Sequence, residues 1–132
     1  MSRILALDYG AARCGCAVSD PSGTLATPLP VVEQPGTRKG LGRVAEVVAE
    51  YGVEEVVVGL PLTLRGEEGT QAEETRDWAD RLERRLQGTK VHLYDERLTT
   101  RQAERTGGSA DADSRAAAHL LEAFLDSRRA TA

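Results

Sequence analysis

Acidic residues stand at the ends of three predicted elements. Asp8 closes an apolar run that starts at Arg3, Asp95 and Glu96 follow a later strand-like run, and Asp113 opens an amphipathic C-terminal segment. Carboxylates gathered in one place would repel one another, and hard divalent ions with oxygen ligands are their natural counter-charge. Two such ions about 3.5–4 Å apart can position both the attacking water and the leaving oxygen of a phosphodiester. The acids therefore indicate metal-dependent cleavage of phosphodiester bonds.

Each acid also has a purely structural interpretation. Asp8 could end a strand in solvent, Glu96 could pair with the neighbouring Arg97, and Asp113 could cap the N-terminus of a helix. If their strands are parallel neighbours, however, Asp8 and Glu96 emerge at the carboxyl edge where open α/β sheets bind ligands. Asp113 heads an apolar stripe with helical spacing, so we expect it to face the sheet. The stripe consists of Ala116, Ala117, Leu120, Leu121 and Phe124.

The first part of the chain predicts three antiparallel strands. Arg3–Asp8 is apolar on both faces and is followed by a turn, Arg13–Ser19 returns as a second strand, and Thr24–Glu33 is a third. Pro28 and Pro30 lack a backbone N–H, which confines the third strand to the edge of a sheet.

The rest of the chain alternates between helix and strand. Apolar residues at helical spacing predict a helix that ends at Gly52, and a buried parallel strand around Val56–Val58 follows. Next come a helix from Ala72 to Leu86, a fifth strand that ends at Asp95 and Glu96, a short helix near Thr100–Glu104, and a terminal helix. This order predicts an α/β fold with a mixed five-stranded sheet, in which three antiparallel strands precede parallel strands and helices flank the sheet.

The composition fits one folded domain over residues 1–132. Charged residues make up 29% of the chain and hydrophobic residues 40%, and no apolar run approaches the roughly 20 residues of a membrane span. The N-terminus shows no signal pattern, so we expect a cytoplasmic protein with no membrane partner. The formal net charge of −4 argues against binding to nucleic acid by bulk charge, although local contacts remain compatible with it.

Cys14 and Cys16 are the only cysteines. Residues two apart on a strand share a face, and a disulfide between them would be strained. Small buried strand residues are the favoured interpretation, with an intermolecular disulfide as the alternative. No second pair of cysteines or histidines stands at zinc spacing.

Four segments resemble, in their order and spacing, the YqgF/RuvX family, whose members are described as Holliday-junction resolvases and as nucleases that mature pre-16S ribosomal RNA. The segments are DYGAARCGCAVSD, VVVGLPLTLRGEEGTQA, YDERLTTRQA and DADSRAAAHLLEAFLD. The resemblance covers nearly the whole chain. It implies an RNase H-like fold and a nuclease that uses one or two Mg²⁺ or Mn²⁺ ions.

The resemblance also implies roles for particular residues. It assigns catalysis and metal binding to Asp8, Glu96 and Asp113, the acids singled out above. It places Arg13 near the substrate, because Arg13 occupies the basic position of the family's Gly-x-x-(Arg/Lys)-x-Gly pattern. Thr100 belongs to the segment that matches the family pattern Asp-Glu-Arg-(Leu/Phe)-(Ser/Thr)-Thr.

Three further arginines are candidates for phosphate contact. Arg97 and Arg101 fall on one face of the short helix expected after the fifth strand, and Arg115 lies near the start of the terminal helix. Arginine suits bidentate contacts to phosphate. A solvated helix face is the alternative interpretation of all three.

The expected partner is nucleic acid, either structured RNA or branched DNA, bound by a monomer or a homodimer. Symmetric cleavage of a junction favours two active sites and therefore a dimer. Two other functions compete with the nuclease. A non-catalytic RNase H-like binding module would be favoured by loss of one of the three acids. An ATPase lobe like those of actin and the sugar kinases would need a second lobe.

Overall fold

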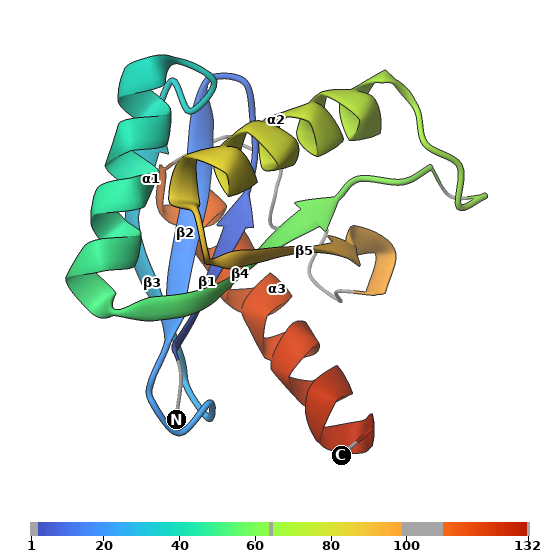
Figure 1. The fold of residues 1–132 in the computed structure, drawn as a ribbon. Coiled ribbons are helices and arrows are strands. Elements are labelled where there is room, and N and C mark those ends of the chain that lie inside the picture. The colour runs from blue at the N-terminus through green and yellow to red at the C-terminus, as the bar shows by residue number, and fades with distance from the viewer. Residues whose placement is uncertain (1–2, 64, 99–109, 132) are drawn as a thin grey trace.

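The computed structural model of this protein describes residues 3–63, 65–98 and 110–131. Figure 1 shows the arrangement of the elements in these ranges. In chain order they are β1 (Arg3–Asp8), β2 (Arg13–Ser19), β3 (Ala26–Glu33), α1 (Arg38–Tyr51), β4 (Val53–Leu60), α2 (Thr70–Leu86), β5 (Lys90–Asp95), the short 3₁₀ helix η1 (Glu96–Leu98) and α3 (Ala110–Thr131).

The strands form one mixed sheet in the order β3-β2-β1-β4-β5. β2 pairs antiparallel with both β1 and β3, whereas β4 pairs parallel with both β1 and β5. This arrangement confirms the predicted mixed sheet. The carboxyl ends of β1, β4 and β5 consequently lie at one edge, which is where open α/β sheets bind ligands.

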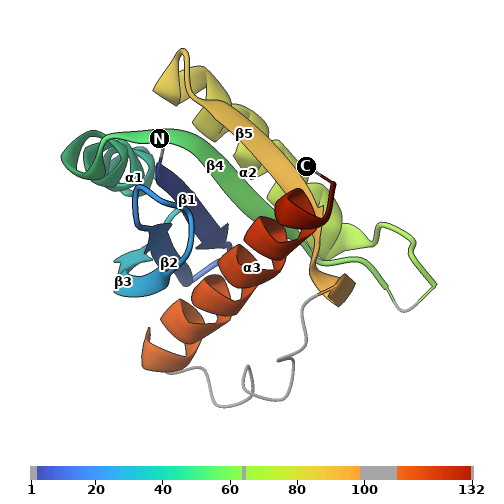
Figure 2. The same cartoon turned by 90° about the horizontal axis from the view of Figure 1, so that it is seen from below.

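The helices cover the two faces of the sheet unequally. α3 crosses one face, whereas α1 and α2 cover the other (Figure 1, Figure 2). Because side chains alternate along a strand, Ile4 and Ala6 of β1 belong to the apolar cluster under α3. Leu5 and Leu7 belong to the cluster under α1 and α2, which also contains the buried Trp78. Burial on both faces explains why β1 is apolar throughout.

β3 is an edge strand, as its prolines predict, but it begins at Ala26 rather than at Thr24. The carboxylate of Asp20 accepts hydrogen bonds from the backbone N–H groups of Thr24 and Leu25, at 2.8 and 2.9 Å. These donors are therefore used by a local turn and do not join the sheet.

The ends of α1 have clear physical causes. Thr37 is the N-cap, since its side-chain oxygen accepts a hydrogen bond from the backbone N–H of Gly40 at 3.0 Å. Gly52 ends the helix with φ of +62°, in the left-handed region that glycine adopts without strain. The predicted end of this helix is confirmed. The short helix predicted near Thr100–Glu104 lies outside the described residues.

Two sequence expectations concern the interior and the membrane. Cys14 and Cys16 are both buried and unbridged, which favours the interpretation as core residues over an intermolecular disulfide. Burial also raises the pKa of the Cys14 thiol well above its usual value, so this group is a poor nucleophile. Among the described helices, none is both long and apolar enough to cross a membrane.

Candidate active site

Asp8 is the last residue of β1 and lies on the face that α3 covers. Its position follows from strand alternation, because Ile4 and Ala6 occupy that face. Asp8 is paired in register with Gly15 of β2. On its other side Leu7 is in register with Val58, so Gly59 is the next residue of β4 beside Asp8. Asp8 is thus flanked by two residues that have no side chain.

Glu96 uses the space above Gly59. A Cβ atom built at Gly59 would lie 2.8 Å from Cγ and 3.1 Å from Cδ of Glu96. Glu96 itself is only 6% exposed. The predicted fifth strand includes Glu96, but the observed strand ends at Asp95 and Glu96 opens η1. This change of backbone direction brings the Glu96 side chain back over the neighbouring strand β4.

Asp113 approaches the same row of residues from α3. The helix begins at Ala110, so Asp113 is its fourth residue, and the interpretation of Asp113 as an N-cap is wrong. A Cβ atom built at Gly15 would lie 2.0 Å from the backbone oxygen of Asp113. The buried Ser114 fixes this end of the helix, because its hydroxyl donates to the backbone oxygen of Leu29 on β3 at 2.5 Å.

Arg13 holds the side chain of Asp113. The Arg13 Nε atom lies 2.9 Å from Oδ2 of Asp113, and the two side chains are 30% and 25% exposed. Arg13 precedes Gly15 by two residues on β2 and therefore projects from the same face of the sheet. The pair links the edge of the sheet to the first turns of α3 and balances the charge of Asp113.

The three acids thus approach one row of the sheet, Gly15–Asp8–Gly59, on a single face. Within residues 3–63, 65–98 and 110–131, however, no three acidic, histidine or cysteine side chains stand close enough together to hold an ion. The donor set itself fits a hard divalent cation, which prefers carboxylate oxygens. Asp113 already contacts one positive charge, the guanidinium of Arg13. A metal cation would supply the same kind of counter-charge to the three acids.

The remaining candidates are spread around this edge. Arg97 forms an ion pair with Asp95, the last residue of β5, with 2.7 Å between Nη2 and Oδ2. Arg115 is exposed and lines a cavity of about 630 Å³ between β3 and the start of α3. Thr100 and Arg101 lie outside the described residues.

Other polar and aromatic side chains make contacts within the fold. Tyr9 stacks on the buried Trp78, with 4.7 Å between ring centroids. His92 on β5 contacts Glu55 on β4 at 2.8 Å. His119 contacts Glu122 within α3.

Sequence reasoning missed Gly15 and Gly59 as parts of the site. Both look like ordinary strand glycines, and the apolar character of their neighbours explains their place in the sheet. The signal that identifies them is register: each stands beside Asp8, and each is covered by a segment that carries another candidate acid.

Comparison with solved structures defines the class of fold. The chain resembles RuvC of Thermus thermophilus in complex with a Holliday junction substrate, with a TM-score of 0.61 and 18% identity over 99% of this chain and 98% of that one. The Fowlpox virus resolvase bound to Holliday junction DNA gives a TM-score of 0.52 at 13% identity over 96% of this chain. The mixed sheet and its helices therefore form an RNase H-like fold of the RuvC type.

The family follows from sequence. Residues 2–127 match the model of the RuvX family, described as Holliday junction resolvase. A protein of Mycolicibacterium paratuberculosis, named "Putative pre-16S rRNA nuclease", is 44% identical over 97% of this chain and 82% of its own length. One of Desulforudis audaxviator with the same name is 39% identical over 96% of both chains. The chain belongs to the RuvX family, and the resemblance inferred from its four motifs is confirmed.

Proposed function

We propose that this protein is a divalent-metal-dependent nuclease, built as one RNase H-like domain, that hydrolyses phosphodiester bonds of nucleic acid in the cytoplasm. The observation that carries the proposal is the approach of Asp8, Glu96 and Asp113 to one row at the carboxyl edge of the sheet. Membership of the RuvX family and the names of the relatives support a nuclease. The substrate is the 5′ region of pre-16S rRNA, branched DNA, or both.

In this proposal Asp8, Glu96 and Asp113 hold one or two Mg²⁺ or Mn²⁺ ions. When bound, such ions activate water for attack on phosphorus and stabilise the leaving oxygen. The chain contributes positioning: η1 directs Glu96 over Gly59, and Ser114 anchors the start of α3 that carries Asp113. With an ion bound at Asp113, Arg13 would be released from Asp113 and would contact a phosphate of the substrate, for which its planar guanidinium is suited.

The remaining predicted contacts complete the substrate site. Arg97 follows Glu96 directly, and Arg115 follows Asp113 by two residues. Arg115 lines the cavity between β3 and the start of α3. We propose that both arginines, together with Thr100 and Arg101, contact the nucleic acid strand that contains the scissile bond. Their contacts would be to phosphates and would position the substrate without reading its sequence.

One observation favours a second function, a non-catalytic module that binds nucleic acid. The Arg13–Asp113 ion pair already balances one of the three acids, and no ready ion site exists among the described residues. In such a module the pair would persist when nucleic acid binds. The two functions differ in whether the acids bind metal.

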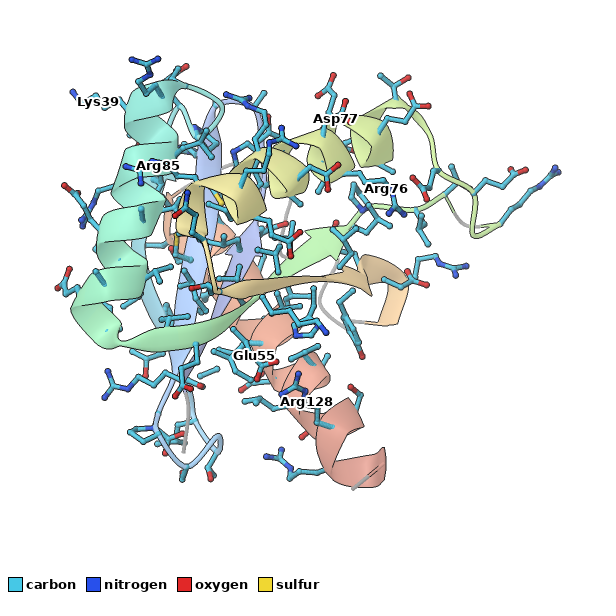
Figure 3. The ribbon with its side chains drawn as sticks, in the orientation of Figure 1. Lys39, Glu55, Arg76, Asp77, Arg85 and Arg128 are labelled. Atoms are coloured by element: carbon cyan, nitrogen blue, oxygen red, sulfur yellow. The ribbon has the colours of Figure 1, made fainter. Side chains whose placement is uncertain are left out.

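Cleavage of matched substrates tests the proposal. Single-stranded RNA, single-stranded DNA, a four-way junction and an RNA with the pre-16S 5′ region are incubated with Mg²⁺, Mn²⁺ or EDTA. We expect cutting with metal by the wild type and none by Asp8→Asn. Asp77→Asn is the matched control, because Asp77 is an exposed aspartate on α2 (Figure 3).

Binding of Mn²⁺, measured by calorimetry, separates the two functions without relying on activity. The nuclease proposal requires binding that Asp8→Asn weakens and Asp77→Asn preserves. A folded wild-type protein that binds nucleic acid, binds no Mn²⁺ and cuts none of the substrates would establish the non-catalytic module instead.

A further inference from the structure

A groove rich in cations lies between α1 and α2, on the face of the sheet opposite to α3. Its central part, of about 520 Å³, is lined by Arg38, Leu41, Arg81, Arg84 and Arg85. A second part of about 470 Å³ continues along α1 and adds Lys39 and Arg43, together with one acidic residue, Glu46. We call this surface the basic groove. It carries six of the 17 lysines and arginines of a chain whose net charge is −4.

The cations of the basic groove are exposed and largely not neutralised by the chain. Across the described residues, Arg38, Lys39, Arg84 and Arg85 form no ion pair, and Arg43 pairs only with the exposed Glu46, at 3.2 Å. No acidic residue is among the described residues that line the central part. Figure 3 shows Lys39 at the start of α1 and Arg85 beside the same helix.

The cations in α1 are unfavourable for the helix that carries them. The first turn of α1 contains Arg38 and Lys39 and no acidic residue, although the positive end of the helix dipole favours acids there. Cations at this end oppose the dipole, so these two residues destabilise the start of α1. Residues that disfavour the helix they belong to, and that form no ion pair within the described fold, indicate a role in binding.

The basic groove begins at the edge of the sheet where Asp8 lies. Arg81 donates to the backbone oxygen of Gly36 at 2.8 Å, and a Cβ atom at Gly36 would lie 3.6 Å from the Tyr9 hydroxyl. Tyr9 directly follows Asp8 and stacks on Trp78 of α2. A polymer that passes through the acidic site therefore needs to turn only around the residues next to Asp8 to reach Arg81.

We propose that the basic groove binds the sugar–phosphate backbone of the nucleic acid substrate, at a distance from the scissile bond. The inference rests on the proposed nuclease function and adds to it a second contact region. A polyanion with regularly spaced phosphates fits a row of unneutralised arginines. The contact would favour long or structured substrates over short strands, since only they reach both faces of the sheet.

Removal of two groove cations tests the proposal. The test variant is Arg38→Gln with Arg84→Gln, two exposed residues from the two helices. The control variant is Lys90→Gln with Arg129→Gln, which removes the same charge from exposed positions on β5 and α3. All proteins also carry Asp8→Asn to prevent cleavage. Filter binding is measured with a radiolabelled RNA duplex of about 20 base pairs, long enough to present many phosphates to the groove.

We expect the groove variant to bind the duplex roughly tenfold more weakly at about 0.1 M salt, and the slope of log affinity against log salt to fall by about 2. The control variant should retain the affinity of the parent. A single strand of about four nucleotides, too short to reach the groove, should bind the groove variant and the parent equally. Equal affinity of groove and control variants for the duplex, or no binding of the duplex by the parent, would overturn the proposal.

This outcome is independent of the cleavage assay. Binding that depends on the groove, in a protein whose wild type cuts nothing, would retain the groove and refute the nuclease. Metal-dependent cutting by the wild type, together with duplex binding that does not depend on the groove, would retain the nuclease and refute the groove.

Discussion

Arg13 on β2 and Asp113 on α3 form an ion pair in which Nε lies 2.9 Å from Oδ2. The pair connects the two elements that bracket the candidate site, and it places a positive charge of the chain against one of three candidate metal ligands. A metal ion that binds Asp113 must therefore compete with Arg13. Substrate phosphate could relieve that competition by attracting the guanidinium away.

Arg13→Gln should strengthen binding of Mn²⁺ in the absence of nucleic acid. The pair is partly exposed, and such pairs contribute about 0.2–1 kcal/mol, so we expect an affinity gain of at most about fivefold in calorimetry. Cleavage should decrease at the same time, because a phosphate contact is lost. Weaker Mn²⁺ binding by the variant would show that Arg13 orients Asp113 for the ion rather than competing with it.

Gly59→Ala should impair the site more than the fold. The added Cβ would lie 2.8 Å from Cγ of Glu96 and 3.3 Å from Cδ2 of Leu120. The Glu96 side chain can move away, so we expect a loss of about 1–3 kcal/mol in unfolding free energy together with loss of Mn²⁺ binding and cleavage. Gly69→Ala is the matched control, since nothing lies within 4 Å of its added Cβ. Normal Mn²⁺ affinity in Gly59→Ala would remove Glu96 from the metal site.

Gly15→Ala should be the more destabilising of the two substitutions. Its Cβ would meet the backbone oxygen of Asp113 at 2.0 Å, and a helix backbone cannot rotate aside as a side chain can. We expect a loss of about 3 kcal/mol or more in urea denaturation. A smaller effect than that of Gly59→Ala would mean that the start of α3 is loosely packed on β2.

Glu55 should make stability depend on pH in the acid range. Hydrogen bonds from Arg128, aided by His92, lower the pKa of Glu55 from 4.5 to about 2, and Figure 3 shows Glu55 beside Arg128. Because the folded-state pKa is depressed, this stabilisation is present above pH 4.5 and is lost as the pH falls toward 2. Its size is about 1–2 kcal/mol, since Arg128 is 42% exposed and solvent screens the pair.

Urea denaturation at about pH 6 and pH 3 measures this contribution. Glu55→Gln should lower the free energy of unfolding at the higher pH. The difference in that free energy between the two pH values should therefore become smaller than in the wild type. Glu54→Gln, at the exposed neighbouring position, controls for loss of a surface charge. The assignment to Glu55 fails if Glu54→Gln changes the pH dependence as much as Glu55→Gln does.

Much of the fold was predictable because hydrophobic periodicity and backbone chemistry act locally. The apolar run of β1 indicated a central strand, Pro28 and Pro30 indicated an edge strand, and Gly52 indicated a helix end. The start of β3 was predicted two residues early, because the side chain of Asp20 takes the backbone donors of Thr24 and Leu25. Here a side chain competes with strand pairing for backbone N–H groups, and the hydrophobic pattern of a sequence does not reveal such competition.

The site was predictable only in part. The acids could be named from their places at element ends, but the roles of Gly15 and Gly59 depend on strand register and on the approach of η1 and α3. The start of α3 also misled, since Asp113 is a plausible cap and yet lies within the helix. The basic groove was not predicted at all, because its cations come from two helices separated by a strand and only packing brings them together.

The stack of Tyr9 on Trp78 gives the protein a built-in optical reporter. Trp78 is the only tryptophan of the chain, it is 1% exposed, and its indole N–H donates to the backbone oxygen of Pro35 at 2.9 Å. Its ring contacts the residue that follows Asp8 and lies on the helix that carries Arg81. Intrinsic fluorescence at this one position therefore monitors the junction between the acidic site and the basic groove, with no label attached.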